Sequence, residues 1–213
     1  MNQNQGDAFE SELRTSIVRF GIEGLTAEQI LQLVKHYEIL IKWNQRFNLT
    51  RITKPQDAAL LNYAESLYGA RFIEESKTML DIGSGAGFPA VPIAIARPEL
   101  DVTALEANQR KSLFLTEAKF ELPLHNLRVL TARLEDTDCS GYDLLTCRAL
   151  DRAEAILPSI ITGLTDGRRL MVYCAQDLAD RLTSQFPKGF KVGVHQIPES
   201  EGRLIVLFSR DSG

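Results

Sequence analysis

A glycine-rich segment is the part of the sequence best suited to binding a ligand. Residues 81–87 read Asp-Ile-Gly-Ser-Gly-Ala-Gly and follow the apolar pair Met79-Leu80 directly. Glycines at the end of a strand let the backbone turn tightly and approach a ligand closely. The dinucleotide fingerprint Gly-x-Gly-x-x-Gly would require a glycine where this chain has Phe88. Two alternatives stay open, a nicotinamide site and a turn that holds no ligand.

The acid in front of the glycines narrows the chemistry of that ligand. The Asp81 carboxylate at a strand end would repel a pyrophosphate, whereas it suits a cationic sulfonium with an amino-acid part. The segment therefore predicts a site for such a sulfonium ligand. The residues expected to form it are Asp81, Gly83, Ser84, Gly85 and Gly87.

Further candidate residues follow the later predicted strands, whose carboxyl ends face the same ligand. Glu106 ends the second strand, where a carboxylate accepts hydrogen bonds from ribose hydroxyls; the alternative is a solvated acid at a helix start. Leu134 and Glu135 follow the third strand, where they could contact an adenine, or Glu135 could be an exposed loop acid. Arg148 follows the fourth strand and could bind a carboxylate or a phosphate, or form a salt bridge at the rim.

From residue 78 onward, short apolar runs alternate with helical stretches, which predicts a doubly wound α/β fold with a mostly parallel sheet. The last two runs have only the turn 198–202 between them, so we expect an antiparallel hairpin at the sheet edge. The predicted strands are 79–82, 102–106, 127–131, 142–146, 170–174, 190–197 and 204–209, and the predicted helices are 89–96, 109–120, 153–161 and 176–186.

Residues 8–77 read as helices without strands. The first helix is expected to end at Gly21, the second to begin with a capping box of Thr26 and Gln29, and a third to begin near Pro55. Residues 1–7 are expected to be a disordered tail. The sequence therefore predicts a helical extension, residues 1–77, packed on a ligand-binding domain, residues 78–213.

Composition limits the class of protein. The chain has 213 residues, of which 44% are hydrophobic, and a net charge of −4. This charge argues against a surface that is basic overall, so any surface that binds nucleic acid would have to be a local basic patch. No apolar run reaches the roughly 18 residues that span a bilayer, and the N-terminus lacks a secretion signal. Cys139, Cys147 and Cys174 match neither a disulfide framework nor a zinc pattern. We therefore expect a cytoplasmic, monomeric protein without a metal or a membrane.

With these motifs in place, the chain resembles the bacterial small-subunit (16S) ribosomal RNA N7-guanine methyltransferases, the family once called glucose-inhibited division protein B. The resemblance covers nearly the whole chain, and the Phe-Pro pair that follows the glycines is its most specific feature. The segments that carry it are Trp43–Thr50, Leu80–Pro89, Pro92–Ile95, Lys111 with Phe114-Leu115, Arg133 with Glu135, and Arg148-Ala149.

The resemblance implies a Rossmann-like class I methyltransferase that uses S-adenosylmethionine (AdoMet) on a guanine of ribosomal RNA, either free or in the small ribosomal subunit. It assigns cofactor contacts to Gly83, Phe88, Leu134, Glu135 and Arg148. Guanine N7 has no proton to lose, so no catalytic residue is assigned. The basic residues expected to contact phosphates are Arg46, Arg51, Arg110, Lys111 and Arg133, with Lys54 and Arg71 as further members of the strip.

The chain departs from the family pattern at two places. Where the family often has His-x-x-Asp-Ser, residues 62–66 read Asn-Tyr-Ala-Glu-Ser, and where it usually has a lysine near the end of the fifth strand, this chain has Tyr173-Cys174-Ala175. Two other functions therefore stay open: a methyltransferase for a small molecule or a protein, and an AdoMet-binding module without catalytic activity.

Overall fold

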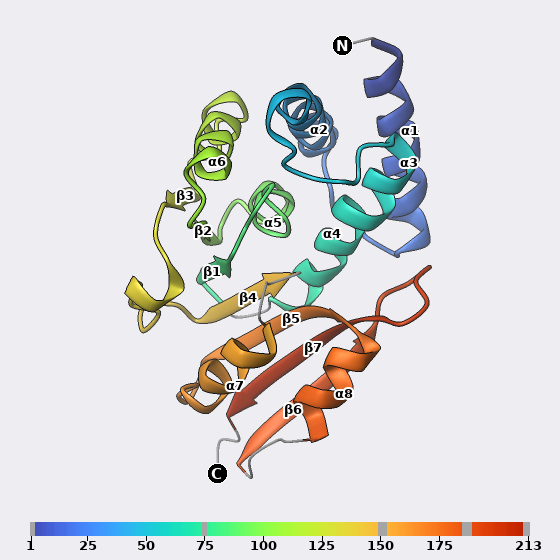
Figure 1. The fold of residues 1–213 in the computed structure, drawn as a ribbon. Coiled ribbons are helices and arrows are strands. Elements are labelled where there is room, and N and C mark those ends of the chain that lie inside the picture. Colours follow the sequence, from blue (N-terminus) through green and yellow to red (C-terminus); the bar gives the residue numbers. More distant parts are fainter. Residues whose placement is uncertain (1–2, 74–75, 149–152, 185–188, 211–213) are drawn as a thin grey trace.

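A seven-stranded sheet organises the molecule (Figure 1). The computed structural model describes residues 3–73, 76–148, 153–184 and 189–210. The strands lie in the order β3-β2-β1-β4-β5-β7-β6. Their bounds are β1 Thr78–Ile82, β2 Asp101–Leu105, β3 Leu127–Leu130, β4 Leu144–Arg148, β5 Arg169–Ala175, β6 Phe190–Gln196 and β7 Arg203–Arg210. Strands β1 to β5 pair in parallel, and β7 pairs antiparallel with both β5 and β6.

The predicted doubly wound sheet with an antiparallel edge hairpin is confirmed. The two hairpin strands lie in the opposite order to their order in the sequence, because β7 pairs with β5 and leaves β6 at the sheet edge. The helices are α1 Gln3–Arg19, α2 Ala27–Phe47, α3 Pro55–Asp57, η1 Ala58–Ala64, α4 Glu65–Gly69, η2 Ala70–Phe72, α5 Ala90–Ala96, α6 Gln109–Glu121, η3 Leu134–Asp136, α7 Ala153–Thr162 and α8 Gln176–Ser184. Among the described helices, none combines the length and the apolar character that crossing a membrane requires.

Alternation of side chains along the strands creates two hydrophobic clusters. Met79 points toward one face of the sheet, where helices α1 to α6 pack, whereas Leu80 and Ile82 point toward the other, which α7 and α8 cover. Asp81 shares the face of Met79, and its register partner on β4 is Thr146. The N-terminal helices thus cover a sheet face that carries buried polar residues.

The N-terminal helices follow the predicted pattern with two differences. The capping box at the start of α2 is confirmed, since Thr26 and Gln29 exchange both hydrogen bonds. The expected disordered tail is wrong for residues 3–7, because α1 already begins at Gln3 and a Cβ atom on Gly6 would lie 2.7 Å from the Glu38 carboxylate. Residues 1 and 2 lie outside the described residues. The third predicted helix is interrupted, since η1 is a π-helix between short α-helical turns.

Candidate functional site

The glycine loop closes onto the neighbouring strand. The amides of Gly83 and Ser84 donate to the Leu105 carbonyl at the end of β2, at 2.9 and 3.0 Å. Gly85 has a φ of +58°, and a Cβ atom on it would meet only the Gly83 carbonyl at 3.8 Å, so the space beside it is open. Gly87 has a φ of +89° and no such space, because a Cβ atom there would lie 2.7 Å from Val91. The loop therefore needs glycine for its backbone conformation at both positions and for packing at Gly87.

Glu106 ties this loop to the start of α6. Its carboxylate accepts hydrogen bonds from the Gly85 amide and from the Asn108 amide, each at 2.8 Å. Asn108 in turn caps α6 by accepting from the amides of Arg110 and Lys111. A carboxylate has about four lone pairs, so Glu106 keeps acceptor sites for ribose hydroxyls after these two bonds.

Asp81 is buried and unpaired. It is fully inaccessible to solvent, and neither carboxylate oxygen makes a hydrogen bond of good geometry to any described residue. The Ser84 hydroxyl donates instead to the Asp81 main-chain carbonyl at 3.0 Å. Burial raises the pKa of Asp81 to about 7, although the nearby Ser84 side chain, the Ala90 backbone and the charge of Arg148 offset part of that effect. An unpaired carboxyl beside a glycine loop fits a cationic ligand group, because a cation there would offset the cost of burial.

An aromatic cluster supports the loop from the helical side. The Phe88 ring meets the edges of His36 and Tyr63, with centroids 5.5 and 5.0 Å apart. Burial lowers the pKa of His36 to about 3, so the ring is neutral, and its Nδ1 shares a 2.8 Å hydrogen bond with the Tyr63 hydroxyl. This pair was not predicted from the sequence, although a histidine within the apolar stripe of α2 was a signal for it.

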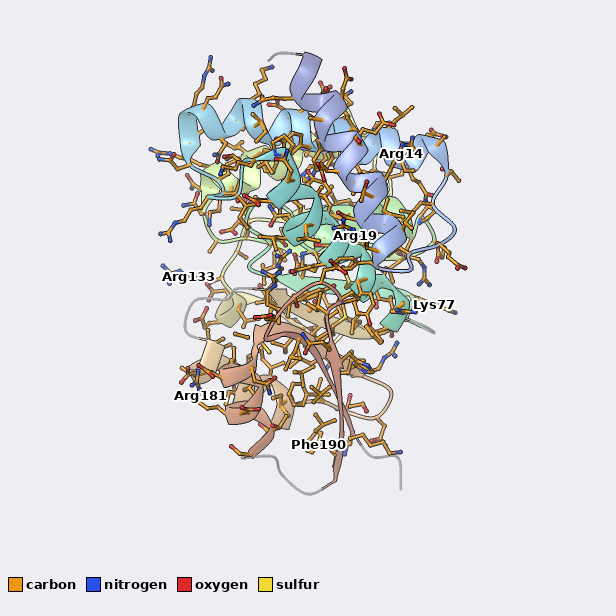
Figure 2. All side chains as sticks on the ribbon, turned by 90° about the vertical axis from the view of Figure 1, so that its right-hand side faces the viewer. Arg14, Arg19, Lys77, Arg133, Arg181 and Phe190 are labelled. Carbon is orange, nitrogen blue, oxygen red and sulfur yellow. The ribbon has the colours of Figure 1, made fainter. Side chains whose placement is uncertain are left out.

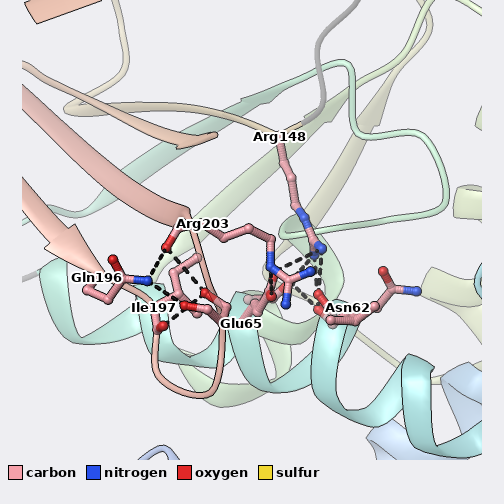
Figure 3. Close-up of polar contacts among 9 residues, drawn as sticks. Asn62, Glu65, Arg148, Gln196, Ile197 and Arg203 are labelled. Atoms are coloured by element: carbon pink, nitrogen blue, oxygen red, sulfur yellow. Dashed lines mark hydrogen bonds and ion pairs between the residues drawn. The ribbon is translucent and has the colours of Figure 1, made fainter. Parts of the chain in front are cut away.

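Arg148 is held by the interrupted helix on the same face of the sheet (Figure 3). Its guanidinium donates to the carbonyls of Leu61 and Asn62, to the Ser66 hydroxyl and to Glu65. Four of its five N–H groups are thus used within the described residues, and the Nε–H is left for another partner. The fourth strand was predicted to end at residue 146, before Arg148, whereas in the structure Arg148 is the last residue of β4.

Glu65 lies between two arginines and is itself only 2% exposed. Its second carboxylate oxygen forms an ion pair with Arg203 Nε of β7 at 2.7 Å. Burial raises the pKa of Glu65, and Arg148 and Arg203 offset part of that effect. The role of Arg203 could not be predicted from the sequence, because no local pattern shows that β7 lies beside α4.

The departures from the family pattern meet in this same network. The Tyr173 hydroxyl donates to the Ser66 carbonyl at 3.2 Å and packs so closely on Gly69 that a Cβ atom there would lie 1.8 Å from it. Asn62 is 4% exposed, and its side-chain nitrogen has no hydrogen-bond partner among the described residues. The replacements at Asn62, Glu65 and Tyr173 are therefore neighbours in one buried polar cluster.

The candidate residues after β3 lie on a short 3-10 turn. Leu134 is half-buried against the cluster that contains Leu80 and Leu105, whereas Arg133 and Glu135 are exposed. Arg133 lies beyond the carboxyl end of β3, whereas Lys77 lies before the amino end of β1. Accordingly, the two side chains project from opposite edges of the molecule (Figure 2). Since β3 pairs in parallel with β2, the turn with Arg133 lies at the same sheet edge as Glu106.

The other basic candidates fall into two places. Arg46, Arg51 and Lys54 are exposed at or just beyond the end of α2, and Arg110 lies over the ring of Phe47 at 5.9 Å from its centroid. Lys111 is half-buried in the first turn of α6. Arg71 lies elsewhere. Together with Arg97 it lines a cavity of about 410 Å³ at the C-terminal end of α5, whereas the glycine loop lies at the N-terminal end of that helix. The position of Arg71 therefore does not support the expectation that it contacts phosphates beside the cofactor mouth. Ala149 and the predicted helix end at Phe186 lie outside the described residues.

Comparisons with known proteins give the family context. The family model described as GidB, rRNA small subunit methyltransferase G, matches residues 29–196. A ribosomal RNA small subunit methyltransferase G from Xanthomonas campestris pv. campestris (strain B100) is 36% identical over 198 residues, which cover 89% of this chain and 91% of that protein.

Solved structures share the fold at low sequence identity. A putative O-methyltransferase from Klebsiella pneumoniae has a TM-score of 0.61 at 12% identity, over 83% of this chain and 90% of that one. A putative methyltransferase from Streptococcus mutans in complex with SAH has a TM-score of 0.53 at 13% identity, over 67% of this chain and 95% of that one.

Proposed function

The chain belongs to the GidB family of rRNA small subunit methyltransferase G proteins, and we propose that it methylates N7 of a guanine in small-subunit ribosomal RNA. It is an AdoMet-dependent methyltransferase. The observation that carries the cofactor assignment to particular residues is the buried Asp81, whose carboxylate lacks a hydrogen-bond partner among the described residues and lies beside a loop with open space at Gly85.

The chain's own residues would bind and orient the cofactor. AdoMet supplies a methyl group activated on a positively charged sulfur. Asp81 would offset that ligand's positive charge, Glu106 would accept hydrogen bonds from its ribose, and Gly85 would leave room for its approach. Leu134, Glu135 and Arg148 complete the proposed set, Arg148 through the N–H group that the interrupted helix leaves free.

No residue of the chain is needed as a general base, because guanine N7 carries a lone pair and no proton. The chain would contribute by aligning the reactants and excluding water. The buried aromatic cluster around Phe88 supports this role, since it fixes the loop from behind without exposing a polar group.

Support for an RNA substrate comes from the basic side chains near the sheet edge where Glu106 lies. Arg46, Arg51 and Arg110 are exposed, and no carboxylate in the described part of the chain forms an ion pair with them. Other surface cations, such as Arg14 and Lys35, are paired with acids. Unpaired cations beside the cofactor loop favour an anionic polymer over a small apolar substrate.

The proposal includes a cellular setting. A ribosomal RNA substrate implies that the protein works in the cytoplasm, on free RNA or on the small subunit, and we propose that it does so as a monomer.

Mass spectrometry of ribosomal RNA tests the proposed function. RNA from cells with the gene is expected to contain one N7-methylguanine in the small subunit that is absent without the gene. Identical modification in both strains would refute the proposal, and a methylated small molecule or protein that disappears instead would favour the alternative substrates.

A further inference from the structure

We infer that Phe47 is a stacking platform for an unpaired base of the substrate RNA. The inference rests on the proposed RNA substrate and deepens it, because it names a residue that recognises a base instead of a phosphate. Phe47 ends α2, and it is 39% exposed although its ring is large and apolar. Base stacking on exposed aromatic side chains is how proteins commonly hold single-stranded RNA.

The ring is fixed in place by its neighbours. Trp43, one turn earlier on α2, lies 5.2 Å from Phe47 between ring centroids and also contacts Phe114 of α6. Asn48 ends the helix in the left-handed conformation, and Asn44 holds the chain that follows by exchanging two hydrogen bonds with Thr50. A fixed ring loses little entropy when a base stacks on it, which favours binding.

The charges around the ring suit a polyanion. The Arg110 guanidinium lies over the ring of Phe47, and Arg46 and Arg51 flank it in sequence, all three exposed and without an acidic partner among the described residues. A guanidinium beside an aromatic ring can stack on a base and contact its phosphate. An apolar protein partner would not need this concentration of cations.

The platform is connected to the cofactor loop through short contacts. Arg110 lies in the first turn of α6, which Asn108 caps. The Asn108 amide donates to the Glu106 carboxylate, which also accepts from the Gly85 amide. A base on Phe47 would therefore lie beside the proposed cofactor site, where it could orient the target guanine or a neighbouring nucleotide.

A binding experiment with three phenylalanine variants, and a salt titration with one arginine variant, test this inference. Fluorescence anisotropy would measure binding of a short single-stranded guanine-rich RNA at low salt. F47L is expected to weaken that binding about fivefold or more, F47Y to keep it, and F120L, which changes another exposed phenylalanine, to leave it unchanged. AdoMet affinity, measured by calorimetry, is expected to stay the same in all three. The salt dependence should keep its slope in F47L and fall by about one in R110A, because only the arginine displaces a counterion.

Trp43 provides a readout in the unaltered protein, because it is the chain's one tryptophan and contacts Phe47. Single-stranded RNA is expected to change its fluorescence, and a duplex of the same sequence is not. The inference is overturned if F47L binds RNA like the wild type, if F47Y loses as much affinity as F47L, or if Trp43 gives no signal while RNA binds. Absence of any RNA binding by the wild type would instead refute the proposed function itself.

Discussion

At the scale of residues, two carboxylates at neighbouring strand ends have opposite surroundings. Glu106 accepts two backbone hydrogen bonds, whereas Asp81 is buried with none from the described residues. Their spacing after predicted strands was enough to propose both as ligand contacts. The hydrogen bond from Gly85 to Glu106 could not be predicted, because it depends on how the loop closes in three dimensions.

We predict that AdoMet affinity depends on pH through Asp81. Its pKa of about 7 lies above the ordinary 3.8, so the folded carboxyl is mostly protonated at pH 6, while a cationic ligand favours the ionised form. Affinity should rise up to about tenfold from pH 6 to pH 8 in the wild type, by calorimetry. Asp81→Asn should bind more weakly and show no such rise; an equal rise in this variant would contradict the assignment.

The same raised pKa has a consequence for stability. Between about pH 4 and pH 7 the folded state binds a proton that the unfolded state has lost, so the free energy of unfolding without ligand should fall as pH rises through this window. Urea titrations should show this contribution in the wild type and not in Asp81→Asn.

Replacement of Glu106 by alanine should weaken AdoMet and its demethylated product alike. Both ligands carry the same ribose, and loss of charge-assisted hydrogen bonds costs about 1.5–3 kcal/mol, or roughly ten- to 150-fold in affinity. The AdoMet affinity of Glu106→Gln should lie between those of the wild type and Glu106→Ala, since one acceptor oxygen remains. Calorimetry that finds a loss for only one of the two ligands would point to another role.

Gly85→Val should reduce AdoMet affinity about tenfold or more, because a branched side chain would fill the open space beside the loop and is strained at a φ of +58°. Gly167→Val is the matched control, since Gly167 also has a positive φ and open space but lies before β5. Equal AdoMet affinity in the Gly85 variant and the wild type would count against the loop as the site.

At the scale of elements, the segment from Pro55 to Phe72 is where sequence and structure differ most. The apolar pattern predicted one helix, yet the structure has a π-helix at η1 whose carbonyls receive Arg148. Helical periodicity does not record such an interruption, and the arginine that these carbonyls bind comes from β4, more than 80 residues further along the chain. The close fit of Tyr173 on Gly69 is equally non-local.

Glu65→Gln should therefore destabilise the protein. Two arginines would then face each other without the anion between them, and breaking a buried ion pair costs about 3–5 kcal/mol, with the lower end expected because Arg203 is 37% exposed. Glu154→Gln is the control, because it breaks an exposed pair with Arg181 and should change stability by less than about 1 kcal/mol. Urea unfolding measures both, and similar values for the two variants would contradict a structural role for the network.

At the scale of the whole molecule, the alternation of strands and helices predicted the sheet, its parallel pairing and the edge hairpin. It could not predict that β7 inserts beside β5, since a hairpin fits either way round. The division at residue 77 into a helical extension and a methyltransferase domain stays a prediction. One hydrophobic cluster joins Phe9 and Leu33 of the helices to Met79 of the sheet, so the two parts share a core.

Methyl transfer by the purified protein tests the central claim most directly. Small ribosomal subunits and free small-subunit RNA from cells that lack the gene would be incubated with AdoMet at low salt and then digested for mass spectrometry. We predict one N7-methylguanine per RNA molecule on at least one of the two substrates. The Asp81→Asn variant should form much less of it. Bound AdoMet with no methyl group transferred to either substrate would contradict the account and favour a binding module without activity.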